Sequence, residues 1–213
     1  MPVPYTRLVR GHLNDGEVAE LVQVDGLASR LHDYLESEST AIDAVHVHGA
    51  KSAAVQEIVA QLLENELNFR SEVVLTPEIG LVIRPRPDFV FRLAEGRGVL
   101  AEVERGGTTT NNHDLKDMWK AHISPDTQHL FLIVPEANWG EGGQAREKPY
   151  LRVCARLAAL FGDTRRELDV VSAHIFGYGR SGPADLVQVN DVEQEDGIHV
   201  RSPPGKGQGV PPG

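Results

Sequence analysis

Two short apolar segments that also carry carboxylates, residues 88–91 and residues 99–104, most constrain the fold of this chain. Both are rich in β-branched and aromatic residues, which is typical of β-strands. The sequence EGRG at residues 95–98 lies between them and has the composition of a turn. The pattern therefore predicts a pair of adjacent strands joined by a short turn.

The carboxylates of this strand pair are predicted to lie close together. Side chains alternate between the two faces of a strand, so Glu102 and Glu104 share one face. With the turn centred in the EGRG sequence, Asp88 is expected opposite Glu104 and diagonal to Glu102, at roughly 7–8 Å between backbones. Three carboxylates at the edge of an apolar sheet are costly unless a cation or a proton compensates them. A solvated strand edge is the alternative to a cation site.

The ligand chemistry of these residues suits a hard divalent cation. Carboxylate oxygens without cysteine favour Mg²⁺ or Mn²⁺ over zinc. Such an ion typically completes its coordination with water and substrate phosphate, and it activates a bound water for attack on a phosphoryl group. Metal-assisted hydrolysis of a phosphodiester is the reaction that this set of groups predicts.

The order of these motifs resembles that of a known nuclease superfamily. RPD at residues 86–88, followed by EVE at residues 102–104, resembles the PD-(D/E)xK core of restriction-endonuclease-like enzymes. A helix at residues 51–65, three strands, a further helix and an apolar strand at residues 129–134 are expected in the order that this superfamily uses. The resemblance covers residues 49–135, under half of the chain. It implies an α/β fold, a three-layer α/β/α sandwich around a mixed sheet.

The resemblance also implies roles for individual residues. Asp88 and Glu102 would bind Mg²⁺ or Mn²⁺, with the main-chain carbonyl of Val103 as a third ligand. Glu57 is similar in position to a helix glutamate that often assists metal binding in the superfamily. A glutamate on a helix is usually exposed to solvent, which is the alternative for Glu57.

The chain departs from the superfamily at Glu104, which stands where a lysine is usual. Some type II restriction enzymes carry Glu or Gln there and remain active, so Glu104 would position or deprotonate the attacking water. Lys120 is the candidate to stabilise phosphate charge, because Asn112, Lys116 and Lys120 recur at four-residue spacing along a predicted helix. A solvent-exposed Lys120 is the alternative.

A polar loop at residues 105–112, RGGTTTNN, follows the second carboxylate strand directly. Its glycines permit close backbone approach, and its side chains can contact phosphate oxygens. The candidate nucleic-acid-binding residues are Arg105, Thr108, Asn111 and Asn112. The loop also fits a simple connector in which Asn111 or Asn112 caps the next helix.

The rest of the chain is predicted to form one nuclease-like domain over residues 1–200. Residues 1–48 are predicted as a helical N-terminal extension, and residues 201–213 as a disordered Pro/Gly-rich tail. The other predicted elements are helices at 17–38, with a break near 25–26, and at 150–161; strands at 44–48, 72–75 and 170–176; and a Gly-rich loop at 138–147.

Composition limits the class of function. The chain carries 31 acidic against 21 basic residues, a net charge of −10, which argues against a nonspecific nucleic-acid coat protein. Local basic patches on a nuclease remain compatible with it. The single cysteine, Cys154, excludes an intrachain disulfide and a Cys-rich zinc site. No stretch reaches the ~18 consecutive apolar residues of a membrane span, and the N-terminus lacks a secretory signal, so a cytoplasmic protein is expected.

We therefore expect a Mg²⁺-dependent endonuclease that hydrolyses DNA, with RNA left open as a substrate and no membrane partner. Because many such nucleases act as dimers, a homodimer is considered, although the sequence identifies no interface. One alternative is a nuclease-like domain that has lost catalysis at Glu104 and binds DNA or protein. Another is a purely structural or oligomerisation domain.

Overall fold

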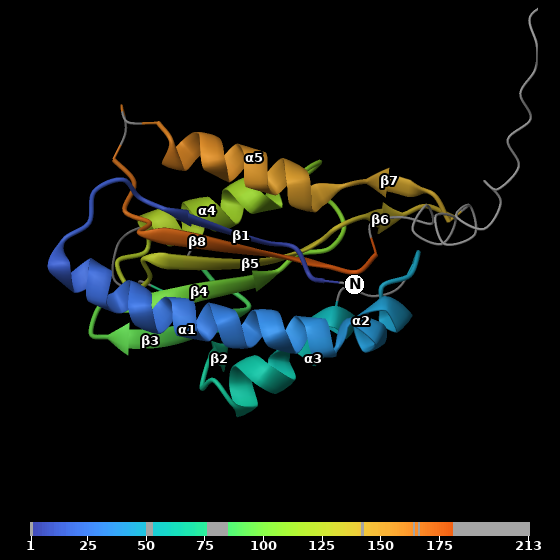
Figure 1. Ribbon diagram of the computed structural model, residues 1–213, viewed down its shortest axis with the longest axis horizontal. Helices are drawn as coiled ribbons and strands as arrows, with labels where there is room; N and C mark the ends of the chain where they lie inside the picture. The colour runs from blue at the N-terminus through green and yellow to red at the C-terminus, as the bar shows by residue number, and fades with distance from the viewer. Residues whose placement is uncertain are drawn as a thin grey trace, which may run out of the picture. The chain divides into compact units, whose positions relative to one another are not determined.

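The computed structural model describes residues 2–49, 53–75, 85–141, 143–163, 165 and 167–180. The described residues form a six-stranded mixed sheet in the order β1-β8-β5-β4-β3-β2 (Figure 1). Its strands are β1 (Tyr5–Val9), β2 (Arg70–Ser71), β3 (Phe89–Ala94), β4 (Arg97–Val103), β5 (His129–Pro135) and β8 (Ser172–Tyr178). The helices are α1 (Asp15–Ser37), α2 (Ser39–Val45), α3 (Ala53–Asn65), α4 (His113–Ile123) and α5 (Pro149–Phe161). A separate two-stranded ribbon joins β6 (Asn138–Trp139) to β7 (Ala145–Glu147).

The centre of the sheet is parallel. β4, β5 and β8 pair in parallel, whereas β1, β3 and β2 pair antiparallel on either side of them. α4 connects β4 to β5, and α5 connects β5 to β8. β5 and β8 are buried along their whole length, as expected for parallel strands whose two faces are covered by helices.

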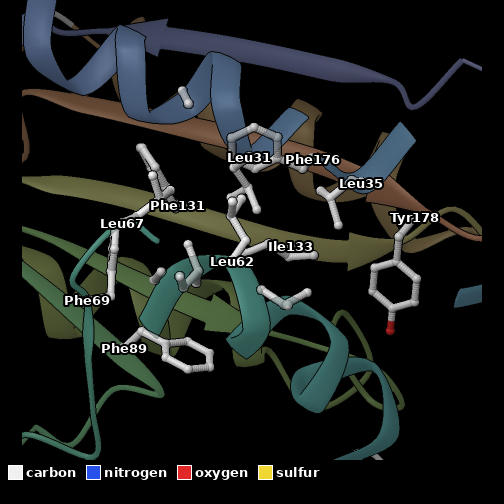
Figure 2. Packing of buried hydrophobic residues seen from close by; sticks show 14 of the residues in the cluster. Leu31, Leu35, Leu62, Leu67, Phe69, Phe89, Phe131, Ile133, Phe176 and Tyr178 are labelled. Carbon is white, nitrogen blue, oxygen red and sulfur yellow. The ribbon is translucent and has the colours of Figure 1, made fainter. Parts of the chain in front are cut away.

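One face of the sheet is covered by α1 and α3. Leu31 and Leu35 of α1 and Leu62 of α3 pack in one cluster with Phe131 and Phe176 of the sheet (Figure 2). All five side chains are at most 4% exposed. This cluster contains most of the aromatic side chains of the core, and it anchors the N-terminal helices to the sheet.

The opposite face is covered by α4 and α5. Met118 of α4 and Val153 and Leu157 of α5 pack against Leu100 and Leu132 of the sheet. With helices on both faces, the chain is a three-layer α/β/α sandwich, and the predicted fold class is confirmed (Figure 1).

The predicted helical extension at residues 1–48 is wrong in two respects. β1 pairs with β8 and so belongs to the main sheet. The predicted break near residues 25–26 is also absent, because α1 runs through it as one helix. A capping box between Asn14 and Glu17 starts α1, and a continuous buried stripe holds it, which outweighs the ~1 kcal/mol cost of Gly26 in a helix.

Two predicted strands are replaced by other structures. Residues 44–45 end α2, and His46 is its C-cap, so no strand forms at 44–48. The strand predicted at 72–75 is also absent, because Glu72 has a φ of 52°, a left-handed conformation that ends the ladder after Ser71. The predicted loop at 138–147 contains the β6–β7 ribbon.

Several predictions concern the ends of the chain or its surroundings. The tail at residues 201–213 lies outside the described residues. Within the described ranges, no helix is both long enough and apolar enough to cross a membrane. Four other predicted elements are confirmed to within a few residues. The helices predicted at 51–65 and 150–161 are α3 and α5, and the strands predicted at 129–134 and 170–176 are β5 and β8.

Candidate functional site

Asp88 and Glu102 meet where β3 begins and β4 ends. Pairing of Phe89 with Ala101 places the preceding residue, Asp88, across from Glu102. The backbone N–H of Asp88 donates to Glu102 Oε2 at 3.2 Å, and the N–H of Val103 donates to Asp88 Oδ2 at 2.9 Å. The two carboxylates are therefore held by each other's strand.

This register corrects the prediction that Asp88 lies opposite Glu104. A shift in the pairing between Arg92 and Ala94 moves the strands relative to each other near the turn. The three carboxylates still lie near one another, but across the described residues they are not grouped closely enough to bind one ion together. Leu100 of β4 packs against the α4/α5 layer, and alternation places Glu102 on that same side.

α4 presents a second set of charged groups to this face. Lys120 Nζ lies 2.6 Å from Glu102 Oε1 and 2.9 Å from Asp117 Oδ1. His113 Nδ1 lies 2.9 Å from Glu104 Oε2. His113, Asp117 and Lys120 follow the spacing of four and three residues that places side chains on one face of a helix.

The carboxylates are buried, which favours their protonated forms. Burial, and then the negative charge of Asp117, raises the pKa of Glu102 to about 8, although Lys120 opposes this shift. Burial and Asp117 likewise raise the pKa of Glu104 to about 8. Burial also raises the pKa of Asp88 and of Asp117. More carboxylates are thus gathered here than one ammonium group compensates.

Lys120 remains charged in this environment. Desolvation alone would lower its pKa, but the charges of Asp117 and Glu102, together with hydrogen bonds to both, raise it above the usual value. The side chain of Lys120 is 28% exposed, whereas that of Glu102 is 5% exposed. Lys120 therefore presents a fixed positive charge between the buried carboxylates and solvent.

One carboxylate oxygen of Asp117 is an acceptor without a hydrogen-bond donor among the described residues. Oδ2 of Asp117 is fully buried and accepts no hydrogen bond from the described residues. A proton on Glu104 would supply the missing donor, because a hydrogen bond between these two carboxyls favours protonated Glu104. Burial and the negative charge of Asp117 thus favour a protonated Glu104 beside Asp117.

The carboxylates of the cluster have the ligand chemistry that suits a hard cation, but the geometry limits how many of them can bind one ion. Half-buried Asp88 and buried Glu102 offer carboxylate oxygens near other acidic groups, which suits Mg²⁺ or Mn²⁺. Across the described residues, no three His, Cys, Asp or Glu side chains are grouped closely enough to hold a metal by themselves. Mg²⁺ is usually held by one or two carboxylates with water and phosphate, so the pair Asp88 and Glu102 is the relevant donor set.

Glu57 is not part of this cluster. Its helix, α3, packs on the opposite face of the sheet from α4, through Val55, Val59 and Leu62. Glu57 itself is exposed, and it makes none of the hydrogen bonds or ion pairs of the cluster. The structure therefore does not bring Glu57 to the predicted metal position.

The loop after β4 contains the residues predicted to contact nucleic acid, and these residues differ in burial and in hydrogen bonding. Thr108 is fully buried and donates to the carbonyl of Arg105, so its hydroxyl is turned inward. Asn112 occupies the N-cap of α4 with a φ of 55°, but its side chain makes no capping bond; it accepts from Arg156 Nη1 at 3.3 Å. Asn111 is exposed, and Arg105 donates through Nη2 to the carbonyl of Val47.

Sequence reasoning assigned no role to Asp117 or His113, although both contact the cluster. Their signal was present in the helical spacing with Lys120, but their orientation depends on how α4 packs against the sheet. Comparison with known proteins adds no assignment, because no protein-family model and no curated protein sequence matches the chain.

Proposed function

We propose that this protein is a metal-dependent nuclease that hydrolyses phosphodiester bonds of DNA. The observation that carries the proposal is the convergence of Asp88, Glu102 and Glu104 with Lys120, which arrives from a different element. A group of buried carboxylates with raised pKa values and one fixed cation is typical of a catalytic site. The arrangement also agrees with the PD-(D/E)xK resemblance, with Lys120 in place of the lysine that Glu104 displaces.

Asp88 and Glu102 would hold the cation. A bound Mg²⁺ supplies a Lewis acid for a phosphoryl oxygen and lowers the pKa of a water. Val103 contributes its N–H to orient Asp88, and its carbonyl is the proposed third ligand. Burial favours the protonated form of Glu102, so a cation that binds there would displace this proton.

Glu104 and Lys120 would act on the reacting groups. Glu104, with a pKa of about 8, would accept a proton from the attacking water in its ionised form, which predominates above about pH 8. His113, 2.9 Å from Glu104, provides a nearby group to orient that carboxyl. Lys120, fixed between Glu102 and Asp117, stabilises the charge that develops on the phosphate oxygens.

The test combines metal binding with cleavage. Calorimetric titration with Mg²⁺ and Mn²⁺ is expected to show binding to the wild type that Asp88→Asn abolishes. Cleavage of supercoiled plasmid DNA is expected to fall about 100-fold or more in the same variant. Asp33→Asn, an exposed aspartate on α1, is the matched control and should change neither measurement. Metal binding and cleavage that are both unaffected by Asp88→Asn would refute the proposal.

A non-catalytic binding module is the second candidate. It is favoured by the hydrogen bonds that already occupy Glu102, from Lys120 and from the Asp88 N–H. This candidate predicts DNA binding that is indifferent to Mg²⁺ and to Asp88→Asn, with no cleavage of any DNA form. The same titration and plasmid assay therefore distinguish the two.

A further inference from the structure

A cleft opens around Arg105, the residue that follows Glu104 of the carboxylate cluster in the chain. It has a volume of about 520 Å³, which is within the range of ligand-binding pockets. Three segments line it: the turn after α2, the loop that follows β4, and the β6–β7 ribbon. In Figure 1, α2 and the ribbon lie at the same end of the sheet as the end of β4.

The cleft is joined to the cluster by consecutive residues and direct contacts. Arg105, which lines the cleft, follows Glu104 in the chain. The hydroxyl of Tyr178 donates to the carbonyl of Glu104 at 2.7 Å. The ring of Tyr178 is in edge contact with His46, another lining residue, at 5.0 Å between centroids. These contacts place the cleft at the end of β4, one residue after Glu104, and they reach the main chain of Glu104.

The walls of the cleft are fixed to one another. Asn138 Nδ2 donates to the carbonyl of Arg105 at 3.0 Å and to Glu147 Oε2 at 3.2 Å. His46 Nε2 lies 2.8 Å from the carbonyl of Ala137. The ribbon, the loop and the end of α2 are thus tied together before any ligand arrives, which reduces the entropic cost of binding.

The lining residues combine positive charge with an aromatic surface. The exposed side chain of Arg146 lies against Gly140, where an added Cβ would come within 2.9 Å of it, and Arg146 makes no ion pair with the described residues. The carboxylate of Glu147 already accepts from Asn138. Trp139 is half-buried and lines the cleft. In a chain of net charge −10, this local excess of cationic groups indicates an anionic ligand.

We propose that this cleft binds an unpaired nucleotide segment of a DNA strand next to the bond that the carboxylate cluster hydrolyses. Arg146 and Arg105 contact its phosphates, and Trp139 stacks on a base. A cationic groove with an aromatic platform is how proteins hold single strands without reading their sequence. A cleft of about 520 Å³ has the size of a small-ligand site, which suits one nucleotide of a strand better than a duplex. The inference rests on the proposed nuclease function and specifies its substrate as DNA with a single-stranded portion.

The test measures binding by fluorescence anisotropy, with a labelled single-stranded oligothymidylate and a labelled blunt-ended duplex as probes. Wild type is expected to bind the single strand more tightly. Trp139→Ala should weaken single-strand binding by about 5- to 150-fold, which is ~1–3 kcal/mol of stacking at tenfold per 1.4 kcal/mol. Arg146→Ala should weaken it and reduce its dependence on salt. Arg165→Ala, an exposed arginine beyond the far end of α5, is the matched control and should have no effect.

The outcomes separate this inference from the proposed function. Affinities for the single strand that are equal in the wild type, Trp139→Ala and Arg146→Ala would overturn the inference, and so would equal losses for the blunt duplex. Plasmid cleavage is measured in parallel on the same proteins. Absence of cleavage, with single-strand binding that depends on Trp139 and Arg146, would overturn the nuclease and leave the cleft as a binding site. Trp139 and Arg146 both lie outside the core, and thermal unfolding of the two variants checks that they fold.

Discussion

Two buried polar networks lie in the same sheet, and they are balanced differently. The carboxylate cluster lies at the carboxyl end of β4 and faces α4. The second network, which we call the histidine chain, consists of Tyr5, His174, Ser172, His129 and Glu20. It starts at the amino ends of β5 and β8 and reaches Glu20 on α1.

Each member of the histidine chain hydrogen-bonds to the next one. The Tyr5 hydroxyl lies 2.7 Å from His174 Nδ1, and Ser172 Oγ lies 3.0 Å from His174 Nε2 and 2.8 Å from His129 Nδ1. His129 Nε2 ends the chain at Glu20, which Arg97 neutralises. If each donor points along the chain towards Glu20, every one of these atoms has one partner.

The two networks differ in the charge of their members. Burial lowers the pKa of His129, and lowers that of His174 to about 3, so both rings are neutral at pH 7. The carboxylate cluster instead holds four acidic groups around Lys120, and Asp117 Oδ2 lacks a donor. A network that is complete without a ligand serves stability, whereas one that gains a proton or a cation to become complete is suited to chemistry. The position of the carboxylate cluster also agrees with the rule that ligands bind at the carboxyl ends of parallel strands.

The largest effect that tests this contrast is expected at Lys120. Lys120→Met should lower DNA cleavage about 100-fold, because it removes the charge that faces the phosphate. It should also lower the free energy of unfolding by about 1–3 kcal/mol, less than the ~3–5 kcal/mol of a fully buried pair, because Glu102, with its pKa raised to about 8, holds a proton near neutral pH and is not left as an unpaired buried charge. Lys116→Met, one turn earlier on the exposed side of α4, should change neither quantity. Plasmid cleavage and urea unfolding measure the two.

A second substitution sharpens the role of Lys120. If Lys120 replaces the lysine that the superfamily carries at the position of Glu104, then Glu104→Lys in the Lys120→Met background should recover part of the lost cleavage. Cleavage that falls further in the double variant would instead assign Glu104 an independent role in accepting the proton of water. Both results are read from the same plasmid assay.

The sequence predicted the elements around this site better than their mutual placement. The alternation in residues 99–104 and the spacing that leads to Lys120 are local, so the strands, the helix and the shared face of Glu102 and Glu104 could be predicted. The pairing of Asp88 with Glu102 could not, because a register shift near Arg92 leaves no clear pattern in the sequence.

Glu57 shows the second limit. Its helix was predicted correctly, but which face of the sheet that helix covers depends on contacts between distant segments, such as Leu62 with the sheet. Residues 44–48 show a third, since their β-branched residues favour a strand while the packing of Ile42 holds the preceding turn of α2. Local propensity decides an element only where tertiary packing does not oppose it.

An intermediate effect is expected in the histidine chain. Ser172→Ala removes the hydroxyl between His129 and His174 and leaves two buried ring nitrogens without partners. The expected cost is about 1–3 kcal/mol of unfolding free energy, with DNA cleavage unchanged. Ser37→Ala, an exposed serine at the end of α1, is the control and should be neutral. A loss of cleavage with unchanged stability in Ser172→Ala would mean that the histidine chain is coupled to the catalytic site.

The most specific effect is a dependence of stability on pH. The folded pKa of Glu102 is about 8, above its ordinary value of 4.5, so the folded state holds this proton more tightly than the unfolded state. The stability that Glu102 contributes is therefore complete below pH 4.5 and is lost as the pH rises towards 8. Without metal, Glu102→Gln should become steadily more stable relative to the wild type over this range, by at most about 1.4 kcal/mol per pH unit.

Glu20 provides the matched comparison for this measurement. The hydrogen bond from Arg97 lowers the pKa of Glu20, so this carboxylate is ionised in both folded and unfolded states above pH 5.5. The stability difference between Glu20→Gln and the wild type should therefore be constant from pH 5.5 to 8, measured by urea unfolding in the presence of a chelator. Added Mg²⁺ at pH 8 should stabilise the wild type and Glu20→Gln but not Glu102→Gln, because Glu102→Gln lacks one of the two carboxylates proposed to bind the cation. Equal slopes with pH for the two variants would remove the distinction between the networks.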